Sequence, residues 1–222
     1  MKIKLCDVPV RWINVDTATE NAKLMEELFE RLGIKNASRF SAITDVPPHE
    51  GVRPGEEHYR NCAESHFHIL QEAIDSNSFP LLILEDDLEI ENGLEEHIGE
   101  DLEIPDDTDA IYFGTSHGDG NYEAIDQQNG WSKIQKVFAT HAIMYMNENI
   151  AKQVIKTGKE WIYGKNHPFD VGFAYEVQPK FNVYAPYIPF FYQADAKNKV
   201  NKWESITRTP LNRKKKFSIF TL

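Results

Sequence analysis

Several features that identify common protein classes are scarce or missing in this sequence. Only two cysteines, Cys6 and Cys62, occur among 222 residues, and they form neither a disulfide framework nor a metal-spaced cysteine pair. No apolar run approaches the roughly 18 residues that span a bilayer. The opening residues, MKIKLCDVPVRW, lack the apolar core of a signal peptide. We therefore expect a cytoplasmic protein with reduced thiols and no transmembrane segment.

Positively charged residues are also fewer than negatively charged ones. The chain has 24 lysines and arginines against 35 aspartates and glutamates, which gives a net charge of −11. This balance argues against a surface that wraps nucleic acid. The exception is a basic C-terminal tail at about 208–222, which contains Arg208, Arg213, Lys214, Lys215 and Lys216. The tail is either a solvated terminus or a peripheral contact with an anionic membrane or a phosphate-bearing acceptor.

Glycine-rich nucleotide motifs are missing as well. The sequence contains neither a Walker motif nor a dinucleotide fingerprint, which argues against a nucleotide hydrolase or a dehydrogenase. The glycine-rich stretch GTSHGDGN suits a mobile loop. Its Ser116, His117 and Asp119 are too close along the chain to form a catalytic relay. His66 and His68 are two apart on an expected helix, so they face different ways and do not form a zinc pair.

What the sequence does contain is an alternation of strand and helix patterns. We expect strands over 9–15, 38–43, 80–87, 109–114 and within 134–146, with short strands near 181–193. We expect helices over about 17–32, 57–77 and 148–157. Thr17 with Glu20 resembles a capping box, Asn147 suits an N-cap, and Gly33 and Gly158 suit helix ends. The alternation predicts an α/β fold, with a mostly parallel sheet flanked by helices in a single domain, 1–222.

The stretch PLLILEDDLEI (80–90) contains the strongest candidate for a functional site. Four apolar residues lead directly into Glu85, Asp86 and Asp87. Three adjacent carboxylates at the end of a buried strand repel one another unless a cation is present. Ligands in parallel sheets bind beyond the carboxyl ends of strands, where this triplet lies. On these residues alone, a Mg²⁺ or Mn²⁺ site and a solvated turn both remain open.

Several segments, taken in order, resemble glycosyltransferase family 25, which includes lipooligosaccharide and collagen galactosyltransferases. The matching segments are INVD (13–16), RFSAI (39–43), GEEHYRNCAESHFHIL (55–70), LILEDDLEI (82–90), DAIYFG (109–114), THAIMYMNENIAKQVI (140–155), HPFDVGFAYE (167–176), and Gln193 with Ser205–Ile206. The second helical segment has one or two extra residues before Cys62. The family often carries arginines after the first strand, where this chain reads TATENAK.

The resemblance implies a GT-A-like, Rossmann-like fold and a metal-dependent transfer with inversion from a nucleotide-sugar donor. The donor would be a UDP-sugar, the metal Mn²⁺ or Mg²⁺, and the acceptor a hydroxyl, most simply of a saccharide. Glu85 and Asp87 would bind the metal. The resemblance implies donor contacts from Asn14, Asp16, Ser65, His66, Asp86, Thr140 and His141.

An inverting transfer also needs a base that deprotonates the acceptor hydroxyl. Asp170 is the first candidate and Glu176 the second, because both lie among aromatic residues that would raise a carboxyl pKa. Structural alternatives are open: Asp170 as a helix N-cap, Ser65 and His66 as a buried polar pair, and His141 as a core histidine.

Three other functions remain open at this stage. The chain could be a non-catalytic nucleotide-sugar-binding protein, because the usual arginines are missing near 17–23. It could be a transferase for a hydroxymethylated DNA base, which the basic tail leaves open and the net charge disfavours. It could also be a metal-dependent phosphoesterase, although no further His/Asp cluster at metal spacing supports this.

Overall fold

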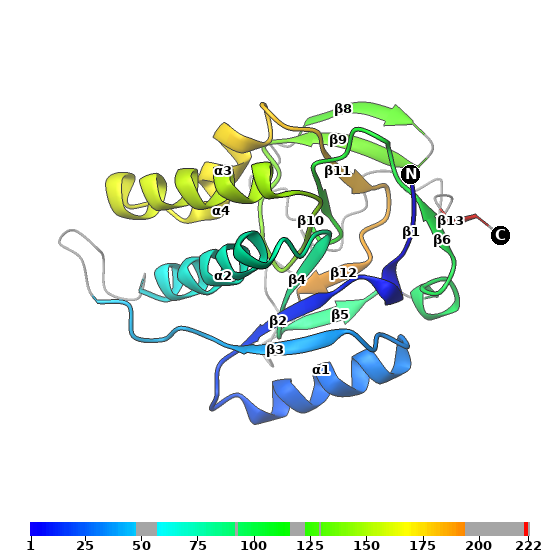
Figure 1. The fold of residues 1–222 in the computed structure, drawn as a ribbon, viewed down its shortest axis with the longest axis horizontal. Helices are drawn as coiled ribbons and strands as arrows, with labels where there is room; N and C mark the ends of the chain where they lie inside the picture. The colour runs from blue at the N-terminus through cyan, green and yellow to red at the C-terminus, as the bar shows by residue number, and fades with distance from the viewer. Residues whose placement is uncertain (48–56, 92, 116–122, 129, 194–219, 222) are drawn as a thin grey trace, which may run out of the picture.

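The computed structural model describes residues 1–47, 57–91, 93–115, 123–128, 130–193 and 220–221. Its centre is an eight-stranded sheet in the order β3-β2-β4-β10-β7-β11-β9-β8 (Figure 1). Six of these strands run in one direction, as the alternation predicts, and β9 and β10 run against them. The chain is thus a mixed α/β domain over its described residues.

The strands of the central sheet have these bounds: β2 Val10–Asn14, β3 Ala37–Ser41, β4 Leu81–Glu85, β7 Ala110–Tyr112, β8 Glu123–Gln128, β9 Trp131–Gln135, β10 Ala142–Tyr145 and β11 Val183–Pro186. Two smaller sheets lie beside it, in the orders β1-β6-β13 and β12-β5. Their strands are β1 Lys2–Lys4, β5 Leu88–Ile90, β6 Asp101–Glu103, β12 Phe191–Gln193 and β13 Phe220–Thr221.

The longer helices are α1 Thr19–Arg31, α2 Glu57–Ser76 and α3 Glu148–Lys159, and the short α4 is Phe169–Gly172. Two π-helical segments, Glu160–Lys165 and Phe173–Val177, continue α3 and α4. Two 3-10 turns, Leu5–Asp7 and Leu94–Glu96, complete the described elements. None of the helices in these residues combines the length and the apolar character that a membrane span requires.

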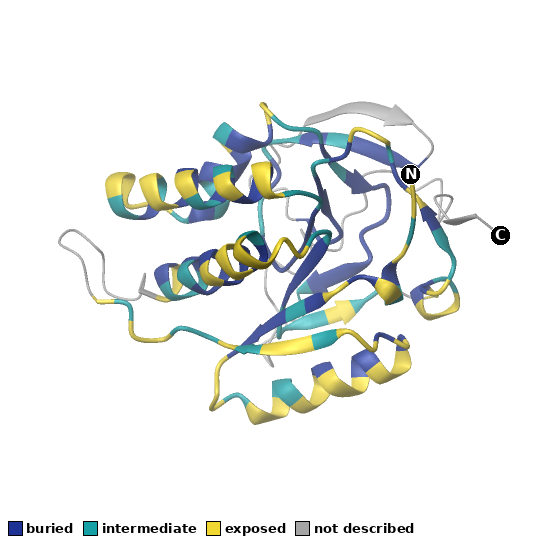
Figure 2. Cartoon of the chain, viewed as in Figure 1, coloured by how far each residue is buried: buried dark blue, intermediate teal, exposed yellow. Residues whose placement is uncertain are grey.

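The inner strands of the central sheet, such as β4, β7 and β10, are buried on both faces, whereas the edge strand β3 is partly exposed (Figure 2). Leu81 and Ile83 of β4 pack with α2, α3 and α4, while Leu82 and Leu84 pack on the opposite face with α1. Successive strand residues point to opposite faces, which explains why β4 is apolar without interruption. By the same alternation, Glu85 extends the Leu81–Ile83 row toward α2, and Asp86 falls on the α1 face.

Most of the expected elements are confirmed, and two predicted helix boundaries are wrong. Asn147 caps α3 by accepting hydrogen bonds from the N–H groups of Asn149 and Ile150. The capping box at Thr17 is not formed, because α1 begins after Ala18, which makes no side-chain cap. Gly158 does not end α3; a Cβ there would lie 2.4 Å from Phe67 Cζ, so this glycine permits close helix packing.

Candidate functional site

Polar side chains gather where β2, β3 and β4 end. Asn14, Ser41 and Glu85 are the last residues of these three parallel strands. The antiparallel strand β10 begins beside the end of β4, because Ala142 is paired with Leu84. Thr140 and His141, which precede β10, therefore reach the same edge of the sheet. This edge corresponds to the ligand-binding side of a parallel sheet.

Glu85 is the centre of a hydrogen-bond network that faces α2. Its Oε1 accepts from Thr140 Oγ1 at 2.8 Å and lies 3.1 Å from His66 Nε2. Cys62 Sγ lies 3.7 Å from the same oxygen. Burial alone would raise the pKa of Glu85, but the hydrogen bond and the charge of His66 hold the pKa below its usual value. The carboxylate is therefore favoured in its ionised form.

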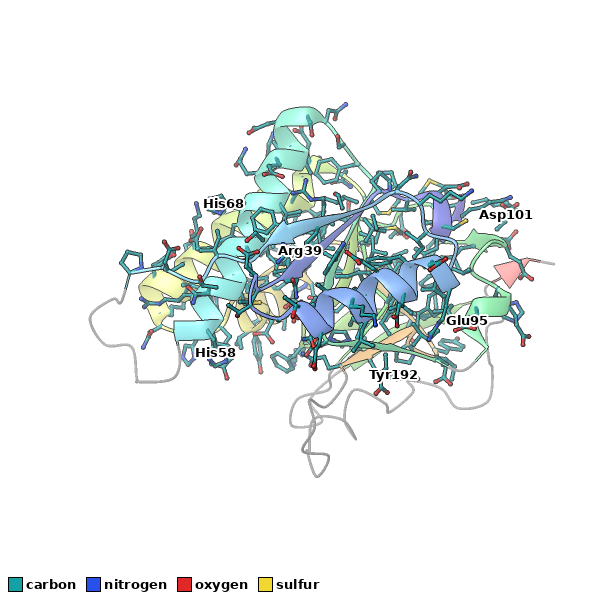
Figure 3. All side chains as sticks on the ribbon, turned by 90° about the horizontal axis from the view of Figure 1, so that it is seen from below. Arg39, His58, His68, Glu95, Asp101 and Tyr192 are labelled. Atoms are coloured by element: carbon teal, nitrogen blue, oxygen red, sulfur yellow. The ribbon has the colours of Figure 1, made fainter. Side chains whose placement is uncertain are left out.

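Asp86 points away from Glu85 and meets the end of β2. Asn14 Nδ2 donates to Asp86 Oδ2, and Arg39 Nε donates to Asn14 Oδ1 at 2.8 Å. Arg39 also forms an ion pair with Asp16 at 2.7 Å, and Figure 3 shows it beside β2 and β3. Asp16 is exposed, and hydrogen bonds from Ser41 and Arg39 lower its pKa. Strand β3 thus supplies an arginine next to the turn where the sequence TATENAK lacks one.

Asp87 is the least compensated member of the acidic triplet. Burial, followed by the charges of Glu85 and Asp86, raises the pKa of Asp87 to about 7. Its Oδ1 is buried without a hydrogen-bond partner among the described residues, although Gln193 of β12 donates to the carboxyl group. In the described part of the chain, neither a lysine nor an arginine forms an ion pair with the triplet. A cation beside Asp87 would offset the repulsion between the negative charges of the triplet.

His141 lies between Glu85 and Gly114 across three neighbouring strands. Its carbonyl accepts from the Glu85 N–H at 2.9 Å, and the register of β10 with β7 places Gly114 on its other side. Burial lowers the pKa of His141, although the charge of Glu85 opposes the change. A hydrogen bond with the Phe191 backbone likewise opposes the lowering. His141 is thus a buried neutral imidazole beside the acidic site.

Gly114 is required by this contact, so we expect Gly114→Ala to destabilise the protein by about 1–3 kcal/mol. A Cβ at position 114 would lie 1.9 Å from His141 Nε2, and the fully buried imidazole has little room to shift. Chemical denaturation measures the change. Gly164→Ala is the control, because a Cβ there meets nothing within 4 Å. Equal effects of the two substitutions would show that the His141 contact is not what requires glycine.

Asp170 is partly buried and is hydrogen-bonded to the segment that presents Thr140. Its Oδ2 accepts from the Ala139 N–H at 3.3 Å, and its Oδ1 accepts from the Val171 N–H at 2.8 Å. Ala139 has a positive φ of 75°, a costly conformation for alanine that this hydrogen bond helps to hold. Burial raises the pKa of Asp170, as expected from the sequence. Pro168, and not Asp170, occupies the N-cap of α4.

Glu176 differs from the prediction. The hydrogen bonds of Lys165 and Trp161 lower its pKa, so the expected rise is wrong. Lys165 Nζ lies 2.7 Å and Trp161 Nε1 2.8 Å from Glu176 Oε1. The carboxylate is thus held in a partly exposed ion pair on the π-helical segments. This environment suits a stable anion better than a proton acceptor.

Two predicted donor contacts of α2 have clear structural partners. Ser65 Oγ accepts from the Ile43 N–H at 2.9 Å and donates to the Asn61 carbonyl at 2.8 Å, so it joins α2 to the segment after β3. His66 is fully buried and faces Glu85, whereas His68 is exposed on the outer side of α2 (Figure 3). The opposite orientations of His66 and His68 are confirmed.

The sequence prediction missed a mixed set of metal-ligating atoms at the same place. Cys62, His66 and Glu85 each offer one such atom, and the three atoms lie within 4.8 Å of one another. The spacing of Cys62 and His66, four apart on one helix face, was a readable signal. Their approach to Glu85 depends on how α2 packs on β4. The predicted loop GTSHGDGN lies outside the described residues from position 116 onward, as does the basic tail up to residue 219.

Comparison with known proteins gives little beyond this geometry. No protein family matches the chain, and no curated protein matches it. Among the solved structures that resemble it, one has a TM-score of 0.41 and 15% sequence identity, over 82% of this chain and 83% of the other. That structure is a glycosyltransferase involved in the glycosylation of the major capsid of PBCV-1.

Proposed function

We propose that this chain is a metal-dependent, inverting glycosyltransferase that moves a sugar from a nucleotide-sugar donor, such as a UDP-sugar, to a hydroxyl acceptor. The observation that carries the proposal is the poorly compensated Asp87 in the triplet Glu85–Asp87 at the end of the central strand β4. Asp87 has a pKa raised to about 7 and a buried oxygen without a described partner. Protein sites of this kind are completed by a hard divalent cation.

The residues present fit a Mn²⁺ or Mg²⁺ ion. Both ions prefer oxygen ligands and use one or two carboxylates, leaving other positions to water and phosphate oxygens. Asp87 and Glu85 would hold the ion. When bound, the ion would neutralise negative charge on the donor diphosphate and so favour departure of the nucleotide. The resemblance of LILEDDLEI to the family-25 signature supports the same roles.

The other polar residues suit donor binding and orientation. Asn14 fixes Asp86, and Arg39 holds Asn14 in turn, so the Asp86 carboxylate has a defined direction. A carboxylate held in this way can accept hydrogen bonds from sugar or ribose hydroxyls. Arg39 could also attract the donor phosphates, because its guanidinium is partly exposed. Thr140 and His141 complete the edge next to Glu85.

Asp170 is the proposed base. Burial raises the pKa of Asp170, which makes its carboxylate a better proton acceptor. It is bound to the same 139–141 loop that contacts Glu85, and it comes from a different segment of the chain than the acidic triplet. An attack with inversion needs the base on the opposite side of the sugar from the metal, and a carboxylate from another segment could meet this need.

We expect one nucleotide sugar to raise the melting temperature of the wild-type protein only when Mn²⁺ is present, because a ligand that binds only the folded state stabilises it. Asp87→Asn should abolish this response. The measurement is a thermal-shift screen of UDP- and GDP-sugars with Mn²⁺ and with EDTA. Released nucleoside diphosphate is then assayed for the sugar that binds.

Asp75→Asn is the matched control for this screen. Asp75 is exposed at the far end of α2, where it accepts from Gln71, so its replacement should leave the response intact. Binding without release of nucleoside diphosphate in the presence of hydroxyl acceptors would favour a non-catalytic binding protein. A panel in which no nucleotide sugar stabilises the wild type would remove the support for the transferase.

A further inference from the structure

We propose that Cys62, His66 and Glu85 form a zinc site, which shares Glu85 with the hard-cation position at Asp87. Cys62 and His66 lie one turn apart on α2, and Glu85 reaches them from the end of β4. The proposal does not depend on sugar transfer, because it concerns only which ion these three side chains bind.

The distances in this group are close to those of a zinc coordination sphere. Zinc binds sulfur at about 2.3 Å and nitrogen or oxygen at about 2.0–2.1 Å, so tetrahedral ligands are separated by about 3.3 Å for N and O and about 3.6 Å for S and O. His66 Nε2 lies 3.1 Å from Glu85 Oε1, and Cys62 Sγ lies 3.7 Å from it. An ion could therefore enter the group with only small side-chain movements.

A buried polar atom of this group has no hydrogen-bond partner among the described residues. This atom is Nδ1 of His66. Buried polar atoms are usually paired, so this unpaired nitrogen indicates a water or other polar partner near the His66 ring. Cys62 and Glu85 are only partly buried, which leaves the group a side open to solvent. A fourth position could be taken by water, as in open zinc sites.

The chemistry of the donor set separates this site from the proposed Mn²⁺ position. Thiolate and imidazole are ligands that favour Zn²⁺ or Co²⁺, whereas Mg²⁺ and Mn²⁺ prefer oxygen. Glu85 belongs to both positions and Asp87 to only one of them. A soft ion is therefore expected at Cys62 and His66, and a hard ion beside Asp87.

Titration of the metal-free protein with Co²⁺ tests the proposal. One equivalent should produce visible d–d bands of a tetrahedral ion and a near-ultraviolet sulfur-to-cobalt charge-transfer band, and Zn²⁺ should displace it. Cys62→Ser should abolish the charge-transfer band and weaken Zn²⁺ binding by about 100-fold or more, since even an indirect partner of a ligand is worth about 10–100-fold. His66→Gln should also weaken binding.

Cys6→Ser is the control, because Cys6 is the only other cysteine in the chain. It should keep the complete cobalt spectrum. Circular dichroism of each variant checks that the fold is retained. A charge-transfer band that disappears in Cys6→Ser, or zinc binding that survives Cys62→Ser and is lost in Asp87→Asn, would overturn the proposal. So would a wild-type spectrum without any thiolate band. None of these results bears on nucleotide-sugar binding by the wild type with Mn²⁺, so the two proposals can fail separately.

Discussion

Asp87→Asn is expected to stabilise the metal-free protein above pH 7, by a difference on the order of 4 kcal/mol at most. The Asp87 side chain is partly buried next to Glu85 and Asp86, and desolvation together with their negative charges raises its pKa to about 7. Asparagine has nearly the same shape and no charge. The substitution thus removes the repulsion within the triplet and keeps the packing. If replacing Asp87 increases stability, the folded protein carries a destabilising negative charge at this site.

The pH dependence of stability follows from the upward shift of the Asp87 pKa. Between the ordinary aspartate pKa near 4 and the folded value of about 7, Asp87 is ionised in the unfolded chain and protonated in the folded one. The folded state then binds more protons, so this group makes stability fall as pH rises through that interval. The wild type and Asp87→Asn should therefore be similar near pH 4 and differ fully above pH 7.

Denaturant unfolding of both proteins from pH 4 to 8.5 in EDTA measures this difference. Adding Mn²⁺ should stabilise the wild type at high pH and leave Asp87→Asn unchanged, because an ion bound only by the folded state adds to its stability. Asp75→Asn should follow the wild type at every pH. Parallel curves for wild type and Asp87→Asn would mean that Asp87 is solvated and ionises normally.

The sequence predicted those parts of the fold that depend on local patterns. The uninterrupted apolar residues of β4, the helical face of α2 and the N-cap at Asn147 all depend on nearest neighbours along the chain. The errors came from positions decided by distant contacts. Gly158 resembles a helix end, but Phe67 and Phe169 from other helices require a small residue there. Thr17 fits a capping box, yet the chain turns into α1 two residues later.

In the candidate site, too, local features were predictable from the sequence and long-range contacts were not. The acidic triplet was recognisable because three carboxylates after a buried strand are unusual. The alternation along β4 predicts the face of the sheet to which each carboxylate points. The side chains that bind these carboxylates could not be predicted from the sequence. Arg39, which contacts Asn14 and Asp16 at the end of β2, lies 25 residues from Asn14 in the sequence. The pairing of Glu176 with Lys165, which reversed its expected pKa shift, likewise depends on the path of the π-helical segments.

Asp170→Asn is expected to reduce nucleoside diphosphate release by about 100- to 10,000-fold while leaving donor binding intact, the range that a positioned proton acceptor contributes. The single amide oxygen can still accept from the Ala139 N–H, so the 139–141 loop should keep its conformation, while the Val171 N–H loses its side-chain acceptor. In the wild type the rate should rise with pH as Asp170 ionises. Because burial raises the pKa of Asp170, this rise should occur at a higher pH than for an ordinary aspartate. The rise should be missing in the variant.

Glu176→Gln separates the two candidate bases. Glu176 forms a partly exposed ion pair with Lys165, so its loss should cost no more than about 1 kcal/mol of stability and little of the rate. Both variants are measured with the nucleotide sugar that stabilises the wild type, with kcat and KM determined separately. A large loss in Glu176→Gln with an unaffected Asp170→Asn would transfer the role of base to Glu176. If Asp170→Asn abolishes donor binding as well as turnover, Asp170 acts by positioning Thr140 and His141, and the proton acceptor lies elsewhere.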